Sequence, residues 1–331
     1  MTRSATAQDA TQTLITFDSD GCTLAGTVTD AAVPVAAALL IPGSGRTDRN
    51  SDVRLPLGQV LRGAITGALA QSLAAAGVAS LRYDKRGVGA SGGDYLSVGM
   101  TQRAADARMA LAALAERYPG LPLLTIGHSE GTYYAARLAL PAGGPDGGYP
   151  GVAGAVLLSG SSRTGDEVLA WQTAQMATRM PASARFVLRL MRTDVVSAQR
   201  KNLAKIMASS GDVIRLQGQR VNARWVRDFV RYDPGPVLSR LTVPVLAITG
   251  GHDLQVPPDD VEAIGTLVRG PFEGHVVADL SHMLRPDPGS IGPRGYKRAT
   301  RQPVSPEVLS LVTAWAARVA SGGRDVASAQ P

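Results

Sequence analysis

The chain has 331 residues, of which 44% are hydrophobic and 18% are charged, and this balance excludes a wholly disordered protein. No apolar run approaches the roughly 20 residues that a membrane helix needs, and the polar first residues lack the apolar core of a secretory signal, so we expect a cytoplasmic protein with no membrane partner. The formal net charge is +7, and residues 161–240 alone hold 14 Lys/Arg against 6 Asp/Glu.

The first part of the chain is predicted to alternate strands with helices. Residues 14–30 alternate in polarity around an Asp-Gly pair, a pattern typical of a β-hairpin. Continuous apolar runs and helical spacing then predict, in order, strand 35–45, helix 58–76, strand 78–84, helix 101–118, strand 122–126, helix 130–140 and strand 152–160. This alternation predicts an α/β fold, a mostly parallel sheet with helices on both faces.

Residues 161–240 interrupt the alternation with mostly helical patterns. The alternation then resumes with strand 243–253, helix 258–269, strand 275–280 and helix 306–320. An insertion between two core strands predicts an all-helical cap, or lid, over the strand ends. We therefore expect a core made of residues 1–160 and 241–331 and a cap made of residues 161–240.

A Gly-x-Ser-x-Gly pattern occurs twice, around Ser91 and around Ser129. Only the second copy lies directly between a buried strand and a helix, so Ser129 is the predicted nucleophile. A nucleophile at such an elbow has a strained backbone, and Gly127 and Gly131 would avoid the clash that bulkier neighbours make there. The alternative is a plain turn in which the serine caps the helix.

A serine nucleophile needs a base and a group that orients the base. His282 follows the last predicted strand, where it can reach over the sheet edge, whereas His128 should point away from Ser129 and support the turn. Asp253 ends the preceding strand at the same edge. The chain order Ser129, Asp253, His282 is the one expected for a catalytic triad on such a sheet.

An oxyanion hole needs two N–H donors beside the nucleophile. The N–H of Glu130 is one candidate, and the N–H of Ser44, in a glycine-flanked loop after the first core strand, is the best second one. The negative charge of the Glu130 side chain is expected to interact favourably with the dipole of the helix that begins there, rather than to contact the substrate.

These motifs together resemble those of the α/β-hydrolase superfamily. The resemblance rests on the elbow, on the acid and histidine after the last strands, and on an Asp-x-Arg-Gly-x-Gly-x-Ser loop formed by Asp84, Arg86, Gly87, Gly89 and Ser91. The stretches "PGSGRTDRN", "LRYDKRGVGASGG" and "GHSEG" are similar to a bacterial branch of serine esterases, also labelled peptidase-like or acyl hydrolases.

The resemblance implies an eight-stranded core, a triad of Ser129, Asp253 and His282, and oxyanion donation from Ser44 and Glu130. The chain departs from the superfamily at one point, since it has Pro42-Gly43 where a His-Gly pair is common.

Residues 161–240 give two indications of the kind of substrate. Their apolar side chains could line an acyl pocket or could pack the cap onto the core; these are Trp171, Met176, Met180, Phe186, Leu190 and Met191. Their excess of +8 charges could attract an anionic ester, or could form a solvated outer face. Nucleic-acid binding is not expected, because exposed aromatic residues do not alternate with the basic ones.

We therefore predict a serine esterase that cleaves carboxylic esters of small-molecule substrates through an acyl-enzyme. A thioesterase, a peptidase-like amidase or an acyltransferase would use the same triad. A ligand-binding protein that has lost turnover is a further alternative. No cofactor and no metal are expected, since no metal-ligand spacing occurs. The oligomeric state is not predicted.

Overall fold

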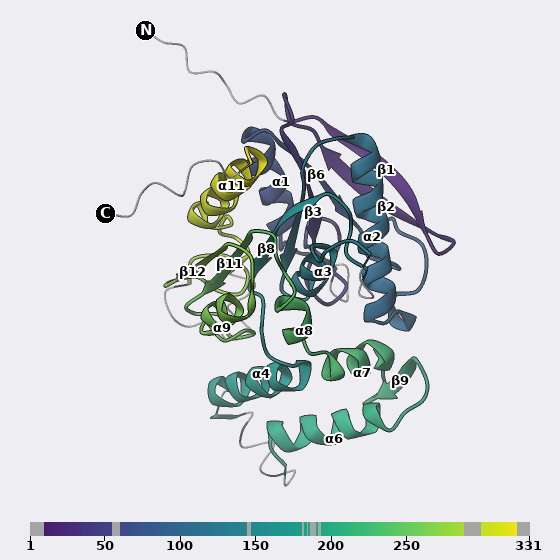
Figure 1. Cartoon of the computed structure of the whole chain (residues 1–331). Coiled ribbons are helices and arrows are strands. Elements are labelled where there is room, and N and C mark those ends of the chain that lie inside the picture. Colours follow the sequence, from purple (N-terminus) through teal and green to yellow (C-terminus); the bar gives the residue numbers. More distant parts are fainter. Residues whose placement is uncertain are drawn as a thin grey trace.

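A computed structural model describes residues 10–54, 60–143, 147–180, 182–183, 185, 190, 193–287 and 299–322. Its centre is an eight-stranded sheet with the order β1-β2-β6-β3-β7-β8-β11-β12 (Figure 1). The strands are β1 (Gln12–Ser19), β2 (Cys22–Thr29), β3 (Ala36–Ile41), β6 (Val78–Tyr83), β7 (Leu123–His128), β8 (Val152–Leu158), β11 (Val245–Gly250) and β12 (Phe272–Val277). All neighbours from β6 to β12 are parallel, as the alternating sequence predicts.

The antiparallel edge of the sheet is the predicted hairpin. β1 and β2 pair over their whole length, and β2 also pairs antiparallel with β6. Asp20 and Gly21 form the turn with φ values of 49° and 71°, and the Gly21 N–H donates to Asp18 Oδ1. Two successive positive φ angles suit a two-residue turn between twisted strands, which is why the Asp-Gly signal was informative.

Helices cover both faces of the sheet (Figure 1). On one face lie α1 (Ile65–Ala75) and α11 (Pro306–Ala320), and on the other lie α2 (Met100–Arg117), α3 (Gly131–Leu138) and α9 (Asp260–Leu267). Successive residues of β3 alternate between the two hydrophobic cores, so both of its faces are buried and its sequence is apolar throughout. Within the described residues, no helix is both long and apolar enough to span a bilayer.

The chain between β8 and β11 forms an insertion that contributes no strand to the central sheet. Its elements are α4 (Gly165–Arg179), α6 (Val195–Met207), β9 (Val213–Leu216), β10 (Gln219–Asn222), α7 (Ala223–Arg231) and α8 (Gly235–Leu238). Figure 1 shows α4, α6 and α7 together at one end of the molecule, away from α1 and α11. The expectation of an all-helical insertion is wrong at β9–β10, where Gln217 and Gly218 form a positive-φ hairpin turn.

Several expected element boundaries are also wrong, and the strands expected over 35–45 and 243–253 end at Ile41 and Gly250. The helix expected over 58–76 begins only at Ile65, because Val60–Leu61 form β5, which pairs with β4 (Val53–Arg54); residues 58 and 59 lie outside the described residues. The strand expected over 275–280 is β12, which lies three residues earlier in the chain. Apolar residues continue past the end of β12 into the turn before His282, and this continuity hid the true boundary. A short 3-10 turn, η2 (Tyr95–Ser97), precedes α2.

Candidate active site

Ser129 occupies a strained elbow between β7 and α3. Its φ is 53°, a left-handed conformation that costs a non-glycine residue about 1–3 kcal/mol. The Ser129 N–H donates to the Leu158 carbonyl at 2.8 Å, which ties the elbow to the neighbouring strand. A Cβ on Gly127 would lie 2.2 Å from the Gly131 carbonyl oxygen, and one on Gly131 would lie 2.3 Å from that of Ile41. Both glycines are therefore sterically required where the sequence placed them.

The second Gly-x-Ser-x-Gly copy belongs to a structural loop. Ser91 Oγ donates to the Asp84 carbonyl at 2.7 Å and accepts from the Ala25 N–H at 2.9 Å. The Asp84 carboxylate in turn accepts from the Ala90 N–H and pairs with Arg49 at 2.6 Å. The Ser91 hydroxyl thus closes the loop on itself through Asp84 and fastens it to β2 through Ala25.

Asp253 and His282 come together in a buried pair after β11 and β12. His282 Nδ1 lies 2.8 Å and 3.0 Å from the two carboxylate oxygens of Asp253. Burial alone would raise the pKa of Asp253, but the His282 ring and the N–H groups of Gln255 and Val256 outweigh it, so this pKa lies below its usual value. An ionised carboxylate only accepts, so Nδ1 is the donor, and in the neutral ring this tautomer leaves the lone pair on Nε2.

His128 joins the elbow to the loop that carries His282. Its Nε2 lies 2.8 Å from the His282 carbonyl, and the two rings lie 5.0 Å apart. In the described part of the chain, Ser129 Oγ forms no hydrogen bond, to His282 or to another residue. Such catalytic contacts are often long in a free enzyme and tighten only with substrate. The structure therefore brings Asp253 and His282 into contact, and it links the His282 loop to the residue before Ser129.

His128 also predicts a pH dependence of stability. Burial lowers its pKa to about 3, so the folded chain keeps the ring neutral while the unfolded chain protonates it near pH 6.5. The free energy of unfolding should therefore fall as the pH drops from 6.5 toward 4, and it should fall less in His128→Gln. Urea unfolding midpoints at the two pH values measure the difference. His275→Gln, which removes a half-buried histidine of β12, should retain the wild-type decrease; an equal decrease in all three proteins would contradict the prediction.

The other histidines are held elsewhere. His252 Nδ1 lies 2.6 Å from the Asp287 carbonyl. His275 Nε2 lies 2.8 Å from Glu273 Oε1. Among the described residues, no three His, Cys, Asp or Glu side chains are placed to hold a metal ion.

Ser44 and Glu130 line one pocket with Ser129. Within the described chain, neither the Ser44 N–H nor the Glu130 N–H donates a hydrogen bond. The loop that carries Ser44 lies against the elbow, since a Cβ on Gly43 would come within 3.1 Å of the Ser129 Cβ. Two free N–H groups beside a serine hydroxyl are what an oxyanion hole requires.

The Glu130 side chain lies in a buried polar network rather than simply at the start of a helix. Both of its carboxylate oxygens lie 2.9 Å from Arg103 Nη1, and Oε1 also accepts from Tyr134 Oη at 2.5 Å and from Trp225 Nε1 at 2.8 Å. Arg103 stacks between the rings of Tyr95 and Trp225, at 4.9 Å and 5.4 Å. Sequence reasoning missed this network, because its members come from separate elements.

The pocket beside Ser129 has a volume of about 70 Å³. The insertion supplies much of its wall, through Val168, Leu169, Gln172, Trp225 and Phe229. Of the apolar residues that could line an acyl pocket, the four that the structure describes are not among its lining residues; these are Trp171, Met176, Met180 and Leu190. Met176 and Leu190 are exposed, and Phe186 and Met191 lie outside the described residues.

Met180 lies instead along a separate groove of about 440 Å³ between α4 and α6. Trp171 is partly buried on α4. Leu169 lines both this groove and the pocket beside Ser129.

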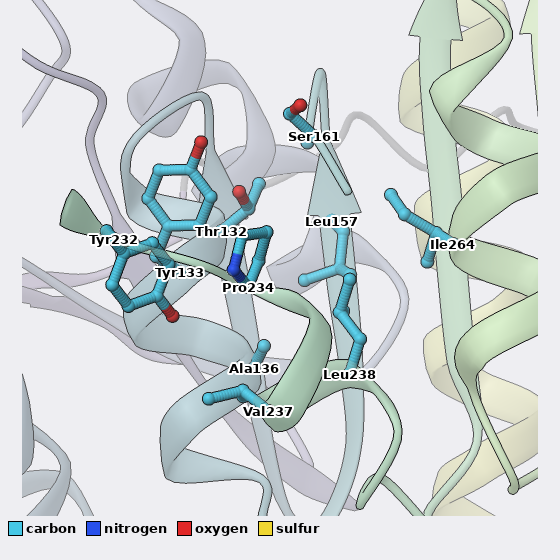
Figure 2. Close-up of a pocket in the computed structure, with 11 residues that line it drawn as sticks. Thr132, Tyr133, Ala136, Leu157, Ser161, Tyr232, Pro234, Val237, Leu238 and Ile264 are labelled. Atoms are coloured by element: carbon cyan, nitrogen blue, oxygen red, sulfur yellow. The ribbon is translucent and has the colours of Figure 1, made fainter. Parts of the chain in front are cut away.

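The last residues of the insertion, where the chain re-enters the core, pack against α3, the helix that follows Ser129. Figure 2 shows Tyr232, Pro234 and Leu238 around a small cavity of about 10 Å³ that Tyr133 and Leu157 also line. The rings of Tyr133 and Tyr232 lie 4.8 Å apart. The insertion thus contacts α3 directly, one turn beyond the elbow.

A family model described as serine aminopeptidase, S33, matches residues 63–288. The chain belongs to this family. The match spans the elbow, the insertion, Asp253 and His282, and it places the chain among the α/β hydrolases, as the sequence motifs suggested. A comparison of the sequence with curated proteins gives no match.

Solved structures of other α/β hydrolases share the fold of this S33 family member. Est1E from Butyrivibrio proteoclasticus, with bound ferulic acid, is 16% identical over 93% of this chain and 97% of its own, with a TM-score of 0.55. The esterase domain of a Rhodothermus marinus protein is 17% identical over 93% and 98%, with a TM-score of 0.55. A Pyrococcus furiosus esterase is 15% identical over 93% and 91%, with a TM-score of 0.57.

Proposed function

We propose that the protein is a serine hydrolase that cleaves carboxylic esters through an acyl-enzyme, with Ser129 as nucleophile, His282 as base and Asp253 as the orienting acid. The observation that carries the proposal is the buried His282–Asp253 hydrogen bond beside an elbow whose serine has a φ of 53°. A turn with a structural role alone does not require both a strained serine and a nearby histidine whose Nε2 can accept a proton.

Each step of the reaction assigns a proton to a named atom. His282 Nε2 takes the Ser129 hydroxyl proton while Oγ attacks the ester carbonyl carbon, and the N–H groups of Ser44 and Glu130 stabilise the oxyanion. The bond to the alcohol oxygen breaks, and His282 gives that oxygen the proton. Water then attacks the acyl carbon and loses a proton to His282 Nε2; the bond to Ser129 Oγ breaks, His282 returns this proton to Oγ, and the carboxylic acid leaves.

The insertion acts in this proposal as a cap, with the chain divided at about residues 161 and 240. Its apolar side chains Val168, Leu169 and Phe229 face the same pocket as Ser129 and favour an ester with a small apolar acyl group. Attraction of anionic esters by the basic charge of the insertion stays a prediction. Thioesters, amides and acyl transfer to another acceptor use the same groups, and no contact in the pocket favours them over hydrolysis of an ester.

Labelling with a fluorophosphonate tests the nucleophile. The wild-type protein and Ser91→Ala should both be labelled, and both should hydrolyse p-nitrophenyl esters, because Ser91 only fastens a loop. Ser129→Ala should take up no label, and its kcat should fall by roughly 10⁶-fold, since the oxyanion hole and substrate binding leave some acceleration over the uncatalysed reaction. Ser91→Ala is the matched control, since it removes a serine from the same five-residue pattern. A wild-type protein that takes no label would favour the non-catalytic, ligand-binding alternative.

A further inference from the structure

Lys85 is a buried cation beside the loop that carries Ser44. The residue is 6% exposed, and its Nζ donates to the Gly43 carbonyl at 2.5 Å and to the Gly45 carbonyl at 2.6 Å. These two carbonyls flank Ser44. Among the described residues, Lys85 Nζ forms no ion pair with a carboxylate, and its hydrogen bonds go to backbone carbonyls. These bonds hold the segment around Ser44 in place.

The Gly43 carbonyl and the Ser44 N–H belong to one peptide group. No cis peptide bond occurs among the described residues, so the two point in opposite directions. Fixing the carbonyl toward Lys85 therefore fixes the N–H away from it. Thr47 Oγ1 also donates to this carbonyl at 3.0 Å, so the peptide group is held from two directions. The Cα of Gly43, at which this peptide group begins, lies close to the Ser129 side chain, since an added Cβ there would come within 3.1 Å of Ser129 Cβ.

The charge on Lys85 also strengthens the donor. A cation at a carbonyl oxygen polarises the whole amide, which makes its N–H a better hydrogen-bond donor. The charged groups that act on Lys85 are Arg103, Glu130 and Asp48. Arg103 and Glu130 form an ion pair with each other, and the protonated form of Lys85 places a positive charge at the Gly43 carbonyl.

We propose that Lys85 is a positioning residue of the oxyanion hole, which orients and polarises the Ser44 N–H through the Gly43 carbonyl. The inference rests on the proposed function. Burial lowers the pKa of Lys85 to about 7, so its charge is lost within the range in which esterase activity is measured. The advantage that Lys85 gives should then be greatest at low pH and decrease as the pH rises through 7.

The test compares the wild type with Lys85→Met, Lys85→Gln and Lys85→Arg on p-nitrophenyl acetate between pH 6 and pH 9. Lys201→Met, on the exposed face of α6, is the matched control for losing one lysine charge. Loss of a whole oxyanion donor costs roughly 10²–10³-fold in kcat, so a disoriented donor in Lys85→Met should cost about 10- to 100-fold. KM should stay within about two-fold, since an oxyanion contact acts in the transition state alone.

The kcat ratio of wild type to Lys85→Met should shrink as the pH rises, and any pH effect that the two proteins share cancels in this ratio. Lys85→Arg should retain more activity than Lys85→Met, because it keeps charge and donors. If Lys85→Met does not fold, Lys85→Gln carries the same comparison with a neutral side chain. A kcat within two-fold of wild type, or a ratio that does not change with pH, would overturn the inference. A wild type that turns over no ester would overturn the proposed function, and this inference with it.

Discussion

Asp253→Asn should lower kcat for an ester by about 10⁴-fold while the protein remains folded. The carboxylate of Asp253 accepts the Nδ1 proton of His282 and leaves Nε2 free to accept another. The amide of asparagine can donate to Nδ1 instead, which moves the ring proton to Nε2. A histidine in that tautomer cannot take a proton from Ser129, so the base is lost although the ring stays in place.

Asp260→Asn is the matched control for this substitution. Asp260 is also buried, but it bonds Ser161 Oγ and Arg163 at the start of α9 and does not contact His282. It should lower stability and leave kcat within a few-fold of wild type. Steady-state kinetics with p-nitrophenyl acetate and thermal unfolding separate the two effects. If both variants lose the same amount of kcat, the loss comes from destabilisation of the fold. That result would contradict the role of Asp253.

The features that were predictable from sequence are those set by short stretches of chain. The elbow was recognisable because Gly127 and Gly131 must lie two residues on either side of Ser129 and because a buried strand precedes them. The positions of Asp253 and His282 followed from parallel topology, which brings the carboxyl ends of β11 and β12 to one edge of the sheet.

The groups that sequence reasoning missed act across long separations. Arg103 reaches Glu130 from α2, Trp225 reaches it from α7, and Lys85 reaches Gly43 from the loop after β6. No periodicity or motif records such a pairing. Lys85 and Arg103 both stand among polar residues in the sequence, which therefore gave no sign that either side chain is buried. The β9–β10 hairpin was missed because its Gln-Gly turn is short and lies among helical patterns.

Glu130→Gln should lower the free energy of unfolding by about 3–5 kcal/mol. Arg103 and Glu130 are both buried, at 4% exposure each, and removing the carboxylate leaves the guanidinium without its counter-charge. The substitution also weakens the acceptor for Trp225 Nε1, which links the insertion to the residue after the nucleophile. Chemical denaturation followed by tryptophan fluorescence measures the loss.

A double-mutant cycle with Arg103→Met isolates the pair. The double variant should be less destabilised than the sum of the two single variants, because neither charge is then left alone in the interior. The pH dependence gives an independent readout. Burial would raise the pKa of Glu130, but Arg103, Lys85 and the hydrogen bonds from Tyr134 and Trp225 bring it below its usual 4.5.

A lowered folded-state pKa contributes stability that is present above pH 4.5 and is lost as the pH falls through the folded value. Wild-type stability should therefore decrease below pH 4.5 more steeply than that of Glu130→Gln. Additive effects in the cycle, together with equal acid dependence in the two proteins, would show that this ion pair does not stabilise the elbow against α2.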